Sequence, residues 1–202
     1  MKLTGHAAAV LTMKFDPSGA HIASGGKDKN VFLWNTLGDC ENYAVLRGHK
    51  NAVTEVAWAA SGEGVWSASA DKTLGFWDAT TGVRARKFGG HRGVVNGVAA
   101  VRRGSMALAA SAGDDGAVKL WDARTRGCVQ EFEAGWPQTC VAFDDAGDGV
   151  FSGGIDNDVK VGAGVAPPPP SPPPHTHPPA CRHTRSQSSS RSCGTCGRTL
   201  RR

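Results

Sequence analysis

The chain has 202 residues, enough for one hydrophobic core and a tail, and its formal net charge is +5. The basic excess lies in residues 162–202, which carry six Arg and no acidic residue, whereas residues 1–161 carry 17 Lys and Arg against 18 Asp and Glu. The folded part therefore gives no electrostatic reason to expect nucleic-acid binding.

The cysteine pattern and the apolar runs exclude two further classes of protein. The six cysteines show no spacing typical of a disulfide framework, which favours a reducing compartment. The apolar run at residues 7–11 is too short for a signal peptide, and no apolar run approaches the length of a membrane span. We therefore expect a soluble intracellular protein.

One stretch, residues 111–122 with the sequence SAGDDGAVKLWD, is the pattern on which the chain is organised. It predicts a short strand, a two-residue hairpin turn at Asp-Gly and a second strand ending in Trp-Asp, because Asp and Gly both tolerate a left-handed backbone. The pattern begins again at residues 24, 67 and 152. In the three complete copies the Ser precedes the Trp by ten residues and the Asp precedes it by six.

Each complete repeat opens with a Gly-His pair, whose His is residue 6, 49 or 91. A Gly follows each of these His residues by thirteen positions and belongs to a β-turn, such as the one at residues 16–19. Between the markers lie four short runs, which in the second repeat are residues 53–58, 64–69, 73–77 and 83–88. Four strands with a period of about 40–45 residues predict one β-propeller blade per repeat.

These repeats resemble the WD-repeat family. Loop and turn residues at 37–44, 67–73, 114–122 and 152–161 resemble in particular the spliceosomal members of that family. The resemblance covers residues 1–161 and implies an all-β fold, a partial WD40 β-propeller. We expect three complete four-stranded blades and an incomplete fourth, whereas a whole ring of this family would have seven.

The fourth repeat departs from the pattern at both ends. Ala134 stands where the opening His is expected, and Gly162-Ala163 stands where Trp-Asp is expected. From residue 162 the sequence becomes rich in Pro, Ser and Arg, with nine Pro between 167 and 179, so we expect a disordered C-terminal tail. We expect residues 1–161 to form the propeller fragment. Residues 162–202 would be foreign to the fold, as translated intron or a misjoined reading frame, or else form a divergent tail.

The His, Ser and Asp of each repeat are also the residue types of a nucleophilic triad. Their recurrence in three repeats, each time with a Trp, favours a structural role, since a protein has little use for three identical active sites. The resemblance implies a hydrogen-bonded chain within each blade, from Asp to His to Ser to the indole N–H. The residues of this structural blade network are His6, Ser24, Asp28, Trp34, His49, Ser67, Asp71, Trp77, His91, Ser111, Asp115 and Trp121.

No catalytic, cofactor-binding or metal-binding residue is predicted, and no cofactor is expected. Cys193 and Cys196 form a single Cys-x-x-Cys pair whose surroundings match no zinc-site spacing. Two Arg-Ser pairs, at residues 185–186 and 191–192, are too few to predict an arginine-serine splicing tail. We interpret both features as accidents of a solvated tail.

The resemblance implies a non-enzymatic protein–protein interaction scaffold that acts in the nucleus in pre-mRNA splicing. Its partner would be the large pre-mRNA-processing scaffold protein of the spliceosomal U5 particle, with RNA contacted only indirectly and no membrane or small-molecule substrate involved. The alternatives are an adaptor of another complex, such as a ubiquitin-ligase substrate receptor, a truncated product without function, and an enzyme. The candidate partner-contact residues, all near turns, are Arg47, Lys50, Lys72, Arg92, Arg102 and Arg103.

Overall fold

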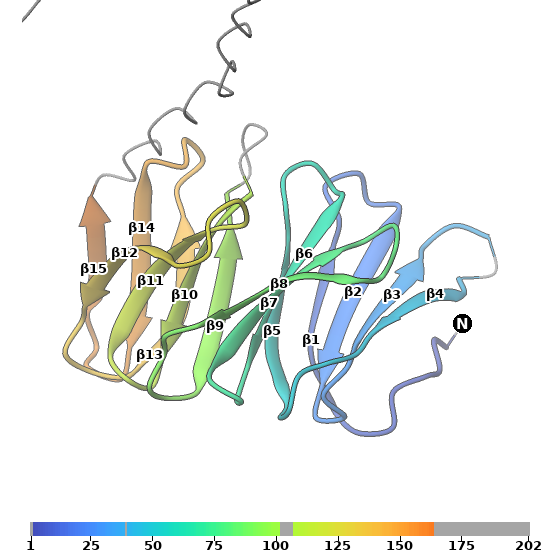
Figure 1. Ribbon diagram of the computed structural model, residues 1–202, viewed down its shortest axis with the longest axis horizontal. Helices are drawn as coiled ribbons and strands as arrows, with labels where there is room; N and C mark the ends of the chain where they lie inside the picture. The colour runs from blue at the N-terminus through green and yellow to red at the C-terminus, as the bar shows by residue number, and fades with distance from the viewer. Residues whose placement is uncertain (1, 39, 102–106, 164–202) are drawn as a thin grey trace, which may run out of the picture. The chain divides into compact units, whose positions relative to one another are not determined.

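The computed structural model describes residues 2–38, 40–101 and 107–163. This part of the chain forms fifteen β-strands, arranged in three antiparallel sheets of four strands and one of three. Within each sheet the strands lie side by side in chain order, as in a β-meander, and we call the sheets blades one to four (Figure 1). Within those ranges there is no helix of the length and apolarity that crossing a bilayer requires.

The strands follow the four sequence repeats. Blade one contains β1 (Val10–Phe15), β2 (His21–Gly26), β3 (Val31–Asn35) and β4 (Asn42–Leu46). Blade two contains β5 (Val53–Trp58), β6 (Gly64–Ser69), β7 (Thr73–Asp78) and β8 (Arg84–Gly89). Blade three contains β9 (Val95–Ala100), β10 (Leu108–Gly113), β11 (Ala117–Asp122) and β12 (Cys128–Glu133). Blade four contains β13 (Gln138–Phe143), β14 (Gly149–Gly154) and β15 (Val159–Ala163).

The predicted all-β fold, a partial propeller with an incomplete fourth blade, is confirmed. In the second repeat β5 and β6 have the expected bounds, β7 is one residue longer, and β8 is shifted by one residue. β15 continues through Gly162 to Ala163, two residues beyond the boundary expected at 161, because both residues pair with β14. The rest of the expected tail, residues 164–202, lies outside the described residues.

The prediction of a two-residue hairpin turn at Asp-Gly is wrong. β10 ends at Gly113 and β11 begins at Ala117, so the loop has three residues. The Gly116 N–H donates to the Gly113 carbonyl at 3.1 Å, and Gly116 has a φ of +72°. This is a turn followed by one left-handed residue, which needs one positive φ where the predicted turn needs two. The equivalent left-handed residues in the other blades are Lys29, Lys72 and Asn157.

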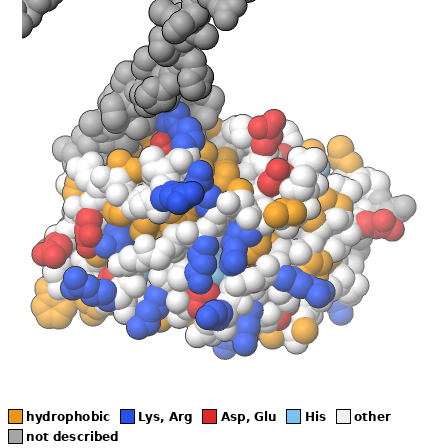
Figure 2. All heavy atoms as spheres, viewed as in Figure 1, with side chains coloured by type: hydrophobic (Ala, Val, Ile, Leu, Met, Phe, Trp, Pro, Cys, Tyr) orange, Lys and Arg blue, Asp and Glu red, His pale blue; other side chains and the backbone are white. Residues whose placement is uncertain are grey.

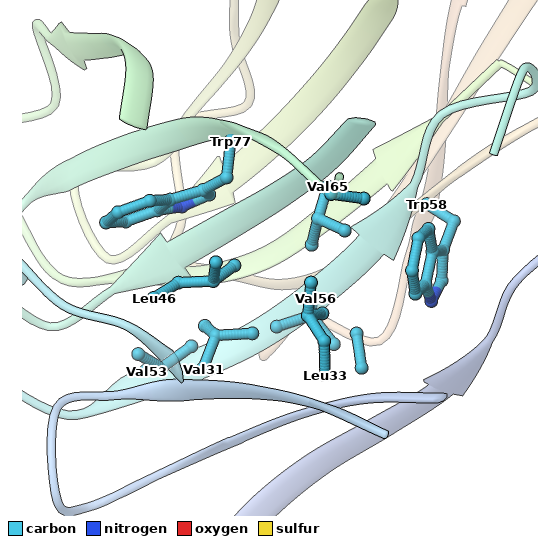
Figure 3. Close-up of a cluster of buried hydrophobic side chains, with 10 residues drawn as sticks. Val31, Leu33, Leu46, Val53, Val56, Trp58, Val65 and Trp77 are labelled. Atoms are coloured by element: carbon cyan, nitrogen blue, oxygen red, sulfur yellow. The ribbon is translucent and has the colours of Figure 1, made fainter. Parts of the chain in front are cut away.

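Successive blades pack against one another through their inner strands: β1 contacts β5, β5 contacts β9, and β9 contacts β13. Between blades one and two lies a buried apolar cluster in which Val31 and Leu33 of β3 meet Val53 and Val56 of β5 (Figure 3). Comparable clusters lie between blades two and three and between blades three and four. Among the described residues, blade one therefore has a neighbour on one side only, and so does blade four.

Candidate functional site

Blade two shows how the predicted network is built. His49 lies in the loop before β5, Ser67 on β6, Asp71 in the β6–β7 turn and Trp77 on β7. His49 Nδ1 is 3.2 Å from Asp71 Oδ2, and His49 Nε2 is 2.7 Å from Ser67 Oγ. Trp77 Nε1 donates to the same Ser67 Oγ at 2.8 Å. Strand pairing and the turn thus bring four side chains from distant sequence positions into one hydrogen-bonded row.

The direction of each hydrogen bond follows from the donors available. The indole N–H of Trp77 can only donate, so the Ser67 oxygen accepts it and has its own hydrogen free for His49 Nε2. His49 then carries its proton on Nδ1 and donates it to the Asp71 carboxylate. Burial, together with the charges of Arg84 and Lys87, lowers the pKa of His49 although the nearby Asp71 acts to raise it, which favours this neutral ring.

The carboxylate at the end of the row is held in its ionised form. Burial alone would raise the pKa of Asp71, but hydrogen bonds from the Lys50 backbone N–H at 2.8 Å, from Thr73 and from His49 lower this pKa to about 2. Asp71 is therefore charged at neutral pH, and it ties the loop that follows His49 to the β6–β7 turn.

The same contacts recur in blades one and three. The four network residues are His6, Ser24, Asp28 and Trp34 in blade one and His91, Ser111, Asp115 and Trp121 in blade three. The His–Asp distances are 2.8 and 3.0 Å, the His–Ser distances are 2.8 and 2.7 Å, and both indole–Ser distances are 2.8 Å. The structure thus places all twelve predicted residues in three copies of one row.

The serines of these rows are not available to a substrate. Ser67 and Ser111 are completely buried, and Ser24 is only 4% exposed. Each hydroxyl lies between an imidazole, to which it donates its hydrogen, and an indole N–H, from which it accepts. A nucleophile must reach its substrate, so the geometry suits internal bracing of a blade and not acyl transfer.

Blade four keeps two members of the row without their partners. Ser152 is buried on β14, and Asp156 lies in the β14–β15 turn. Gly162 occupies the register position of the missing Trp. A Cβ atom added at Gly162 would lie only 3.2 Å from the Phe132 ring. Asp156 forms an ion pair with Lys160, while its other carboxylate oxygen is buried without a hydrogen-bond partner.

Sequence reasoning missed a glutamine near the place of the absent histidine. Gln138 is completely buried, and its Nε2 lies beside Gly154. In blade three, Nδ1 of the network residue His91 lies beside Gly113, the glycine equivalent to Gly154. Its Nε2 donates to the Trp136 carbonyl at 2.9 Å, and its Oε1 has no hydrogen-bond partner. The only sequence signal was a Gln at a strand position that holds Val in the other repeats.

Three of the candidate contact residues lie where the rows reach the surface. Lys50 and Arg92 each follow a network His, and their backbone N–H groups donate to Asp71 and Asp115 at 2.8 and 2.7 Å. Lys72 is the left-handed residue of the β6–β7 turn, with a φ of +70°. The side chains of all three residues are exposed, at the same edge of their blades.

The remaining candidates are placed differently. Arg47 is exposed one residue after β4, whereas Arg102 and Arg103 lie outside the described residues. Sequence reasoning missed Lys27 and Lys29, which are exposed in the equivalent turn of blade one. The signal was present, because Lys29 holds the same repeat position as Lys72.

The family model for "WD domain, G-beta repeat" matches residues 1–35, 40–78, 82–122 and 126–161. The chain belongs to the WD-repeat family. The four matched segments correspond to the four blades, so the repeats found by spacing alone are those of the family.

Curated relatives of this WD-repeat chain confirm the resemblance to spliceosomal members. The pre-mRNA-splicing factor cwf17 of Schizosaccharomyces pombe is 43% identical over 161 residues, which cover 80% of this chain and 47% of the relative. The U5 small nuclear ribonucleoprotein 40 kDa protein of Dictyostelium discoideum is 40% identical over 161 residues, covering 80% and 45%. The Homo sapiens protein of the same name is 45% identical over 155 residues, covering 77% and 43%. The chain thus spans less than half the length of these relatives.

Lys and Arg side chains are scattered over the face shown in Figure 2, separated by hydrophobic and uncharged side chains. Within the described residues no group of three or more His, Cys, Asp or Glu side chains could hold a metal ion. The Cys193–Cys196 pair lies outside them.

Proposed function

We propose that this chain is a non-enzymatic protein–protein interaction scaffold that acts in nuclear pre-mRNA splicing. The observation that carries the proposal is 40–45% identity, over about four fifths of the chain, to proteins named as a pre-mRNA-splicing factor and as U5 small nuclear ribonucleoprotein 40 kDa proteins. The burial of the three network serines supports a scaffold over an enzyme, because these Ser-His-Asp sets are closed to substrates.

The contact surface we propose is the edge that carries Lys50, Lys72 and Arg92. Hydrogen bonds from the Lys50 and Arg92 backbone to network carboxylates fix both loops, so binding would order little more than the side chains themselves. Exposed basic side chains of this kind favour an acidic protein surface. The partner we propose is the large pre-mRNA-processing scaffold protein of the U5 particle, with RNA contacted only through it.

The test is affinity purification of the tagged 202-residue chain from nuclear extract, with U5 small nuclear RNA and U5 proteins quantified in the eluate. We expect both to be recovered. The triple variant Lys50→Glu, Lys72→Glu and Arg92→Glu should reduce recovery at least about tenfold, because three rim charges then repel the acidic partner. Arg126→Glu, an exposed residue in the β11–β12 turn at the other end of blade three, is the matched control and should leave recovery unchanged.

Two results would replace this proposal. Recovery of a ubiquitin-ligase scaffold without splicing proteins would assign the chain to the adaptor class. If tryptophan fluorescence shows a folded chain and neither splicing proteins nor a ubiquitin-ligase scaffold is recovered, the chain has no scaffold function in this form.

A further inference from the structure

Blade one exposes three apolar side chains at positions that are buried in the next blade. Val10, Met13 and Phe15 of β1 are 51%, 59% and 60% exposed. The residues at the same register positions of β5 are Val53, Val56 and Trp58, and all three are buried. Those three pack against blade one (Figure 3). We call Val10, Met13 and Phe15 the leading face, because they point to where a preceding blade would lie.

Blade four exposes the opposite kind of surface. Phe151, Val159 and Val161 are 38%, 74% and 63% exposed. The residues at the same register positions of blade one are Ala23, Val31 and Leu33, all completely buried. Those three pack against the blade that follows. We call Phe151, Val159 and Val161 the trailing face.

Inside the chain, trailing positions always pack on leading positions of the next blade. Figure 3 shows this between blades one and two. Between blades two and three, Trp66 and Leu74 pack with Val95 and Val98. Between blades three and four, the equivalent positions meet in a third cluster. The surface that fits the trailing face is therefore a leading face, and this chain carries one.

A polar contact repeats with the same direction. Thr54 Oγ1 donates to the Val95 carbonyl of the next blade at 2.6 Å, and Asn96 Nδ2 donates to the Gln138 carbonyl of the next blade at 2.9 Å. The donor position in blade four is Thr139, which is exposed and donates to its own blade at Gly153. The acceptor position in blade one is the carbonyl of Val10. One more contact of this kind could therefore form, with the donor supplied by blade four and the acceptor by blade one.

We propose that two copies of this chain associate head to tail, the trailing face of each packed on the leading face of the other. Each copy has one of each face, so a rotation between copies that closes after two lets both contacts form together and leaves no blade face uncovered. Four blades from each copy give eight, within the range of about four to eight found in propellers.

The first test is sedimentation velocity of the full 202-residue chain over a concentration series. We expect a dimer of twice the 21.0 kDa chain mass. Phe15→Glu on the leading face and Val161→Glu on the trailing face should each raise the dissociation constant at least about tenfold, as expected for a charge placed at an interface core. Val83→Glu is the control, since Val83 is 62% exposed and lies on neither face. Tryptophan fluorescence checks that each variant is folded. Met13→Glu replaces Phe15→Glu on the leading face, and Val159→Glu replaces Val161→Glu on the trailing face, where the first choice does not fold.

The second test fixes the register of the contact. The Val56 N–H donates to Thr12 Oγ1 at 3.4 Å, so these two positions are neighbours across the interface between blades one and two. The equivalent pair between copies is Met13 of one chain and Cys140 of the other. In Met13→Cys, mild copper-catalysed air oxidation should form an intermolecular disulfide between residues 13 and 140, found by mass spectrometry. The matched control Met13→Cys with Cys140→Ser should not form it.

Three outcomes would overturn the proposal. One is a folded chain that stays monomeric at the highest concentration. Another is a dimer that is lost with only one of the two face variants, because copies would then meet through identical faces. The third is open-ended growth into larger species, because the faces would then pair without closing a ring.

Discussion

Blades two and four have the same arrangement of their first three strands but differ in what holds those strands together. Blade two has a complete row from His49 to Trp77, an outer strand β8, and a packed neighbour on each side. Blade four has Ser152 and Asp156 without a His or Trp partner, and the structure describes three strands and one packed neighbour for it.

The strand register does not depend on the row. Ser67 pairs with Val56 in blade two, and Ser152 pairs with Val141 in blade four, at the same register position. Alternating side chains and turn residues are therefore enough to set which residues pair. What a following blade adds is burial, since Leu74 packs against blade three and is completely buried whereas its counterpart Val159 is 74% exposed.

The largest difference should come from removing the indole. Trp77→Ala removes a completely buried ring and a hydrogen bond to Ser67, so we expect a loss of about 3–5 kcal/mol in the free energy of unfolding. Trp136→Ala, in the loop before blade four, should cost less than about 0.5 kcal/mol because its ring is 59% exposed. Urea unfolding of the two variants measures both. Equal losses in the free energy of unfolding would mean that the buried Trp77 ring stabilises the chain no more than the exposed Trp136 ring does, against this account.

A smaller difference should separate the two aspartates. Asp71→Ala leaves the His49 ring without its acceptor and should cost about 1–3 kcal/mol. Asp156→Ala removes a carboxylate that already has one buried oxygen without a partner, so its cost should be smaller. The same unfolding measurement compares them. A larger loss for Asp156→Ala would show that blade four is completed by a contact outside the described residues.

The smallest effect should be the pH dependence that the histidines of blades two and three contribute. Burial lowers the pKa values of His49 and His91 below the 6.5 of the unfolded chain. As the pH falls below 6.5, the unfolded state therefore binds protons that the folded state does not, and stability falls. The loss is at most about 1.4 kcal/mol per histidine for each pH unit. His49→Gln with His91→Gln should flatten the curve of unfolding free energy between pH 7.5 and 5.5, and an unchanged slope would contradict this assignment.

The strands and the residues of the row were predictable from the sequence because both are fixed by short, repeated spacings. The turn was not, since Asp-Gly is compatible with both hairpin types and only the backbone of Gly116 distinguishes them. The position of Gln138 was not predictable either, because it lies four residues beyond Ala134, where counting by repeats places the His. The leading and trailing faces depend on which neighbour is present, and spacing does not contain that information.

The most direct test of the comparison is hydrogen exchange, followed by mass spectrometry, on the Phe15→Glu variant, in which association should not cover blade four. Residues 67–77 should exchange more slowly than residues 152–161, because the first segment carries the closed row and lies between two blades. Equal protection of the two segments would contradict the account, since strand pairing alone would then explain the stability of both blades.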